Sequence, residues 1–245
     1  MNKNDLNEAR TNPDFLIYLE AAMQNSIKNQ NIEMMYEILD TMLVLDLEEE
    51  KTNKIYEEIL KVATLNLEEK LEKNELLKLE NIDFLTIRAF YELAIEKWSN
   101  SDFELAKARF FTLANSINDE FLKKNMEVLI VNLSKELDFE DFYEEFVDKD
   151  ELESKEEYGY FITTFNFDVD DFLENHQEFL QKEYENLKHL MMRLHNATME
   201  EELLEQAKKE DDFTKDLDRE FRKFQQLLEK EYYFPNGYAS VNLAQ

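Results

Sequence analysis

The stretch that decides the fold runs from Ala89 to Asn118 and reads AFYELAIEKWSNSDFELAKARFFTLANSIN. Both halves place apolar residues at helical spacing, and the polar residues 99–102 separate them. Four residues of the second half, spaced 3, 4 and 3, share one helical face. They are Phe103, Ala106, Phe110 and Leu113. The small side chain of Ala106 lets a neighbouring helix approach closely, so the stretch predicts two short helices packed as a hairpin.

The rest of the chain is predicted to be helical as well. The 245 residues include only 2 Gly and 2 Pro, and the two prolines, Pro13 and Pro235, lie near the ends. Between them no proline fixes the backbone, and alternating Val/Ile/Thr runs typical of strands are missing. With 43% apolar and 13% aromatic residues, the chain has enough core material to fold. The composition therefore predicts an all-α protein.

The apolar spacing of the second helix recurs twice elsewhere in the chain. An earlier copy consists of Ile32, Met35, Leu39 and Met42, and a later copy consists of Phe139, Phe142 and Phe146. The copies begin 71 residues before Phe103 and 36 residues after it. These intervals are close to twice and once the 34-residue period of tetratricopeptide repeats. The spacing therefore indicates a repeated helical hairpin.

The residues of the central hairpin resemble a tetratricopeptide repeat. Leu93, Ala94, Phe103, Ala106 and Phe110 match its hydrophobic positions, with Ala94 where the two helices meet. The run LAIEKWSNSDFELAKARFFTL, residues 93–113, is similar to a repeat of the type III secretion chaperones that hold translocator proteins. The chain departs from the pattern in two places. Ser101 replaces the glycine between the helices, and Asn118 replaces the closing proline.

The resemblance implies a helical solenoid in which the first helix of each pair lines an inner surface. On the central repeat this would direct Arg88, Tyr91, Ile95 and Trp98 toward a bound partner segment. A tryptophan is a common anchor at protein interfaces. The alternative interpretation is that Tyr91, Ile95 and Trp98 are ordinary core residues. If Trp98 is buried, its indole N–H needs a hydrogen-bond acceptor.

Four regions follow from these patterns. We expect a flexible N-terminus at 1–12, a tetratricopeptide-like helical domain at 13–147, a C-terminal helical region at 148–231 and an uncharged aromatic tail at 232–245. The C-terminal region is expected to contain one long helix from about Asp170 to Leu194, and a second stretch with a coiled-coil-like seam. The seam consists of Leu217, Phe221, Phe224 and Leu228. The tail is expected to pack across the body or to fray, and the alternative is that it docks in a groove.

The charge balance restricts the kinds of partner. There are 57 acidic and 28 basic residues, a formal net charge of −29. Such a field repels nucleic acids and anionic membranes. It either attracts basic or amphipathic protein partners or only keeps the chain in solution. The polar start MNKNDLNEAR has no signal-peptide core, and the apolar run Met42–Leu45 is too short to span a bilayer, so we expect a cytoplasmic protein.

Motifs for catalysis and metal binding are missing from the sequence. The chain has no cysteine, and its histidines, at 176, 189 and 195, have no partner at metal-ligand spacing. Possible calcium loops starting at Asp148 or Asp168 lack both the turn glycine and the final glutamate. Two isolated glycines cannot form a phosphate-binding loop. We therefore expect no enzyme activity, no cofactor and no metal.

The leading hypothesis is a non-enzymatic adaptor or chaperone that binds a partner segment in a helical groove. Two alternatives stay open. One is an acidic mimic that occupies the nucleic-acid site of another protein, against which the scattered lysines argue. The other is a hydrolase or metal enzyme, which the missing motifs disfavour.

Overall fold

The computed structural model describes residues 9–152 and 158–189. Their helices are α2 (Pro13–Lys28), α3 (Ile32–Val44), α4 (Glu49–Glu72), α5 (Asn81–Ser99), α6 (Phe103–Ser116), α7 (Glu120–Leu133), α8 (Phe139–Phe146), α9 (Lys149–Leu152) and α10 (Val169–Asn175). A further helical stretch covers 177–189. The only β-type pairings in the described ranges are two isolated bridges, Leu77 with Ile117 and Val147 with Phe165. The prediction of an all-α protein is confirmed.

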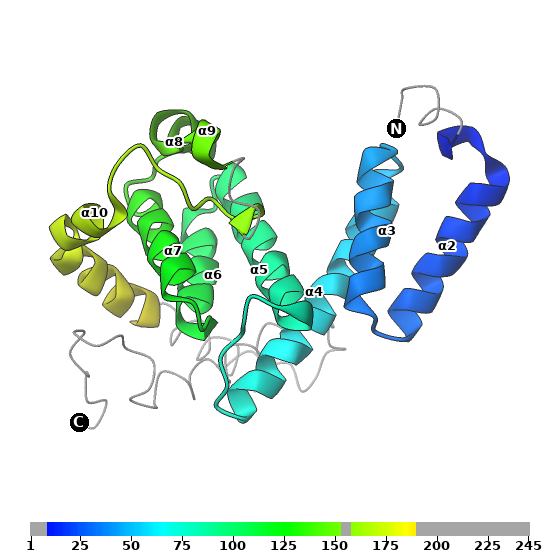
Figure 1. The fold of residues 1–245 in the computed structure, drawn as a ribbon, viewed down its shortest axis with the longest axis horizontal. Coiled ribbons are helices and arrows are strands. Elements are labelled where there is room, and N and C mark those ends of the chain that lie inside the picture. The colour runs from blue at the N-terminus through cyan, green and yellow to red at the C-terminus, as the bar shows by residue number, and fades with distance from the viewer. Residues whose placement is uncertain (1–8, 153–157, 190–245) are drawn as a thin grey trace, which may run out of the picture.

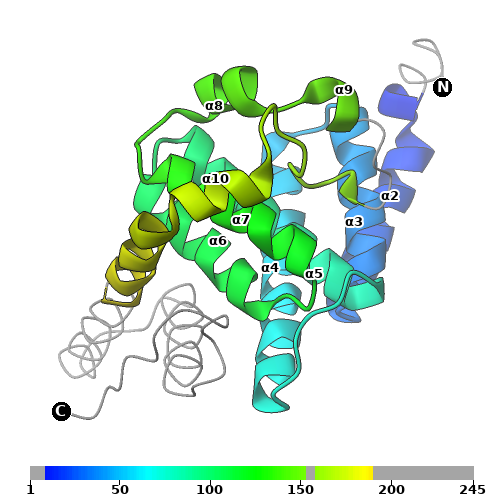
Figure 2. The same ribbon diagram turned by 60° about the vertical axis from the view of Figure 1, so that its left-hand side comes forward.

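The helices follow one another in space in the order of the sequence. Each of α2 to α6 packs against the next helix, and α3 also contacts α5. Figure 1 shows α2 and α3 at one end of the array, with α6, α7 and α10 at the other end. Figure 2 shows α8 and α9 together at one end of the α5–α7 helices, from which the chain returns across them to α10. This succession fits packed helical hairpins, while a tetratricopeptide solenoid stays a prediction.

The predicted central hairpin forms. It consists of α5 and α6, joined by the polar turn, and α5 begins at Asn81, before the quoted stretch. Ala94 and Ala106 are both fully buried in the hairpin, as expected for the small residues at a close helix contact. Ser101 has φ 59°, the left-handed conformation that the missing glycine would adopt easily.

Side chains and left-handed turn residues set the helix boundaries. The side chain of Asn12 accepts hydrogen bonds from the first turn of α2, and Asn31 and Asp119 cap α3 and α7 in the same way. Gln30 and Asp46, with φ 51° and 52°, follow the ends of α2 and α3 in place of a glycine. In the expected flexible N-terminus, Arg10 forms an ion pair with Asp46 at 3.8 Å.

All three copies of the apolar spacing mark the start of a helix. They begin at the first residues of α3, α6 and α8. The first copy is fully buried, and the central copy is buried except for Phe103, which is half-buried. The last copy differs, because α8 ends after 8 residues, and Val147 and Asp148 separate it from the short helix α9.

The expected helix from Asp170 to Leu194 is interrupted. It ends first at Asn175, and a second stretch begins after His176. The ring Nδ1 of His176 lies 2.8 Å from the backbone oxygen of Phe172. That oxygen would accept the His176 N–H in a continuous helix, so the side chain competes with the helical hydrogen bond. The seam at 217–228 and the tail at 232–245 lie outside the described residues.

Candidate partner-binding face of α5

Helix α5 places the four predicted partner-binding residues on one face. Arg88, Tyr91 and Trp98 are buried, and Ile95 is half-buried. Part of the face, at Arg88 and Tyr91, is covered by residues of the segment 158–168, which we call the crossing segment. It leads from the α9 side of the molecule to α10 through turns and bends. The four residues differ in what they contact.

Trp98 has the environment of a core residue. Its exposed fraction is 0%, and its ring packs edge-on against Phe139 with ring centroids 5.4 Å apart. Phe142 lies closer still, at 4.8 Å. The indole N–H donates a hydrogen bond to the backbone oxygen of Leu137 at 2.8 Å, so the acceptor expected for a buried indole is present. Of the two interpretations of Trp98, the structure matches the core residue.

Tyr91 holds the backbone of the crossing segment. Its hydroxyl accepts a hydrogen bond from the backbone N–H of Ile162 at 2.9 Å. Its ring packs edge-on against Phe161 at 5.1 Å and against Phe110 at 5.6 Å. Burial raises the pKa of Tyr91 above its ordinary value, so the hydroxyl stays neutral. Tyr91 thus contacts another segment of the same chain, and its predicted contact with a partner stays a prediction.

Arg88 lies between two aromatic rings and two carboxylates. Its guanidinium carbon is 4.0 Å from the ring centroid of Tyr36 and 4.1 Å from that of Tyr160, a residue of the crossing segment. It forms ion pairs of 2.7 Å with Asp40 and Glu92. Burial raises the pKa of Glu92, although hydrogen bonds from Arg88 and Tyr36 oppose this shift.

These contacts were not predictable from the pattern around α5. Asp40 is 48 residues from Arg88, and Ile162 is 71 residues from Tyr91. Helical periodicity relates residues three or four positions apart and contains no signal for such distant pairs. The excess of aromatic residues in the crossing segment was the only indication that it packs on the body.

An apolar pocket remains open beside the covered part of the face. It has a volume of about 240 Å³ and lies between α5, α8 and the crossing segment. Tyr91 and Ile95 line it from α5, Phe139 and Tyr143 from α8, and residues 159–162 from the crossing segment. Two of the four predicted residues therefore line an open pocket, while Arg88 and Trp98 do not.

The described residues contain no group of three or more His, Asp or Glu side chains that could hold a metal ion. In the same residues, no helix is both long enough and apolar enough to cross a membrane. His176 is bound to the backbone of α10, as described above, and His195 lies outside the described residues.

Comparisons with protein-family models, with curated proteins and with solved structures gave no match to this chain. The resemblance to tetratricopeptide repeats and to translocator chaperones therefore stays a prediction.

Proposed function

We propose that this chain is a non-enzymatic adaptor or chaperone that holds an apolar side chain of a partner segment in the pocket beside Ile95. The observation that carries the proposal is the pocket itself, which is lined by aliphatic and aromatic side chains. At about 240 Å³ it is too small for a typical cofactor, and its size suits one or two side chains.

The way in which α5 holds the crossing segment supports this function. Tyr91 binds a backbone N–H, and Arg88 stacks against a tyrosine ring. Both contacts are of the type used to bind extended peptides, in which backbone hydrogen bonds fix the path and side-chain pockets select the sequence. A partner segment lying beside the crossing segment would extend this arrangement into the open pocket.

The surface next to the pocket indicates the chemistry of the partner. Helix α8, which contributes Phe139 and Tyr143 to the pocket, also carries four exposed carboxylates. They are Glu140, Asp141, Glu144 and Glu145. Only Glu144 has an ion pair among the contacts described, with Lys149 at 2.6 Å. A partner with an apolar residue flanked by lysines or arginines would match both features.

The test is a pull-down from lysate of the source cells with three forms of the chain: wild type, Ile95→Glu and Ile82→Glu. Ile82 lies on the same helix with 48% of its surface exposed, and it does not line the pocket. The same substitution at both sites separates pocket binding from the effect of added charge. We expect a protein that wild type and Ile82→Glu retain and Ile95→Glu loses. Circular dichroism must show that each form is folded.

A partner that all three forms retain would overturn the proposal. Salt provides a second criterion. Binding anchored in an apolar pocket should weaken only moderately when the salt concentration rises, because only the flanking charges are screened, whereas an acidic mimic of nucleic acid would lose its partner steeply.

A further inference from the structure

The most exposed large apolar side chains of the described residues gather at one end of the helical array. Ile17 and Tyr18 of α2 are 68% and 67% exposed, and Leu43 and Val44 in the last turn of α3 are 59% and 61% exposed. Helix α2 packs on α3 and α4 and is the outermost helix in Figure 1. The outer face of an end helix is normally polar, so an apolar end face indicates an interaction site.

The exposed face of α2 is centred on Ala21. Its other members lie within about 60° of Ala21 around the helix axis, at about 100° per residue. They are Asp14, Ile17, Tyr18, Gln24, Asn25 and Lys28, and all of them are exposed. The remaining charged residue of α2, Glu20, lies about 100° from Ala21 and is half-buried. The face is therefore apolar at its centre, with one negative charge near its first turn and one positive charge in its last turn.

The order of these residues fits a second copy of the same helix that runs in the opposite direction. Asp14 and Lys28 each lie seven residues from Ala21, which is about 10.5 Å along the helix axis. A twofold axis at Ala21 places the carboxylate of Asp14 in one copy beside the ammonium of Lys28 in the other. Because the axis relates the two copies, this ion pair forms at both ends of the contact.

We propose that α2 is a dimer interface, in which the α2 helices of two copies of this chain pack antiparallel about Ala21. The small side chain of Ala21 lets the two helices approach closely, and Ile17 and Tyr18 of each copy pack over it. The amides of Gln24 and Asn25 lie opposite these side chains and offer partners to the Tyr18 hydroxyl. An apolar centre with a charged rim is the usual composition of a specific interface.

The charge and the size of the face set the strength of this dimer. Two copies with a net charge of −29 repel each other, and the repulsion is smallest at a face that carries one charge of each sign. A contact between two 16-residue helices, each about 24 Å long, is smaller than a standard interface of about 1,200–2,000 Å². We therefore expect a weak dimer with a dissociation constant on the order of 10 to 100 μM.

The experiment is sedimentation velocity of the full chain from about 1 to 300 μM, at about 0.15 M salt. We expect the wild-type mass to rise with concentration from one chain to two. Ile17→Glu introduces a carboxylate into the apolar centre and should weaken association about tenfold or more. Ile82→Glu is the matched control, because Ile82 lies at the start of α5 with 48% of its surface exposed. It should match wild type, and circular dichroism must show that each form is folded.

A charge reversal tests the antiparallel order. Asp14→Lys sets two positive charges against each other at both ends of the contact and should weaken association by about tenfold, although it lowers the net negative charge of the chain. Asp141→Lys makes the same change at an exposed position in the first turn of α8 and should not weaken association. Asp14→Lys/Lys28→Asp sets opposite charges against each other again and should restore association.

Three results would overturn the proposal. The first is a wild type with the mass of one chain throughout the series, which would assign the α2 face to another occupant. The second is equal weakening by Ile17→Glu and Ile82→Glu, which would place self-association on another face. The third is no weakening by Asp14→Lys, or no recovery in the double variant, which would exclude the antiparallel order. None of these results bears on the pocket beside Ile95, which α2 does not line.

Discussion

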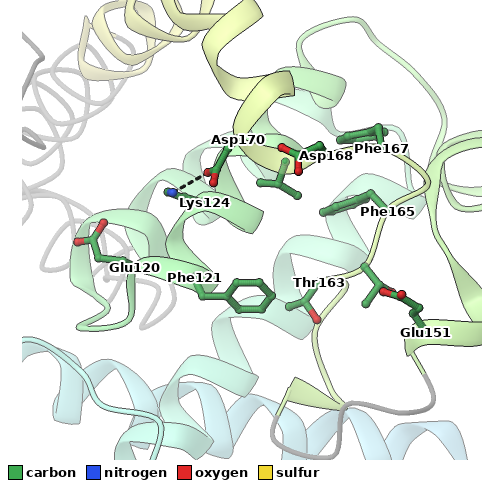
Figure 3. A pocket seen from close by; sticks show the side chains of 11 residues that line it. Glu120, Phe121, Lys124, Glu151, Thr163, Phe165, Phe167, Asp168 and Asp170 are labelled. Carbon is green, nitrogen blue, oxygen red and sulfur yellow. Dashed lines mark hydrogen bonds and ion pairs between the residues drawn. The ribbon is translucent and has the colours of Figure 1, made fainter.

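The two halves of the crossing segment differ in how their polar groups are paired. In the first half, Tyr160 lies on Arg88, and the N–H of Ile162 donates to the hydroxyl of Tyr91. In the second half, the buried hydroxyl of Thr163 makes no hydrogen bond in the structure. Both halves border a pocket: residues 159–162 line the one beside Ile95, and Thr163 and Phe165 line a second one at the first turns of α7 and α10 (Figure 3). The hydrogen bond to Tyr91 stabilises the fold, whereas an unpaired buried hydroxyl costs stability.

The largest expected effect is the difference in stability between a substitution in the core, at Trp98 of α5, and one at the surface, at Phe121 of α7. Trp98→Ala removes a fully buried ring and leaves the oxygen of Leu137 without its donor. We expect the free energy of unfolding to fall by about 3–5 kcal/mol. Phe121→Ala, at an exposed ring, should cost less than about 1 kcal/mol. Urea unfolding followed by circular dichroism measures both, and similar losses would contradict the distinction.

The next effect compares two hydroxyls: that of Tyr91, which binds the crossing segment, and that of Thr163, which belongs to it. Tyr91→Phe leaves the buried N–H of Ile162 without an acceptor, so we expect a loss of about 1–3 kcal/mol in the free energy of unfolding. Thr163→Val removes a buried hydroxyl that has no partner, and we expect it to be neutral or stabilising by up to about 1 kcal/mol. The same urea experiment compares the two, and a destabilised Thr163→Val would show that the hydroxyl is already bonded.

Helix α7 allows a similar contrast in pH dependence. Burial raises the pKa of Glu127, whose carboxylate accepts a hydrogen bond from Tyr184 at 2.9 Å. The folded state therefore binds this proton more tightly than the unfolded state, and stability falls as the pH rises above about 4.5. Glu127→Gln keeps an acceptor for Tyr184 and should flatten this fall. Glu120→Gln removes a nearby charge that is one of the smaller causes of the raised Glu127 pKa, so it should reduce this fall only slightly.

The measurement is the change in the free energy of unfolding between pH 5 and pH 8. This range lies about half a unit or more above the ordinary glutamate pKa. A Glu127→Gln slope equal to that of wild type would contradict a raised pKa.

The smallest expected effect lies in the turn between α5 and α6. Ser101 has φ 59°, a conformation that costs a non-glycine residue roughly 1–2 kcal/mol. Ser101→Gly relieves this cost but makes the unfolded chain more flexible, so we expect a net gain of at most about 1 kcal/mol. A shift of the urea midpoint measures it. Destabilisation by glycine would mean that the weak contact of Ser101 with Asp138, at 3.4 Å, matters more than the backbone conformation.

Local sequence signals predicted the local structure well. The limits of α2 follow from Asn12, Pro13 and the polar turn after Lys28, and the spacing from Phe103 onward predicted the buried face of α6. The break at His176 was missed, because it depends on one side chain bonding the backbone of its own helix. The apolar pattern continues on both sides of that residue and gives no warning of the break.

The candidate site was predicted only in part. The resemblance to a tetratricopeptide repeat assigned Arg88, Tyr91, Ile95 and Trp98 to partner binding, which stays a prediction, and it could not show which of them are accessible. That depends on the crossing segment, which joins α5 through contacts between residues about 70 positions apart. Pairings over such distances depend on the whole fold, and they leave no periodic trace in a single sequence.

The most direct test of the proposed partner site is photo-crosslinking in cells. A benzophenone amino acid replaces Tyr143 at the rim of the pocket beside Ile95, and a second form carries it at Ile82 as the control. The proposed function predicts a crosslink from position 143 and none from position 82. Mass spectrometry should then place it on a partner segment with an apolar residue flanked by lysines or arginines. Crosslinks from position 143 that reach only the chain itself would contradict the proposed site.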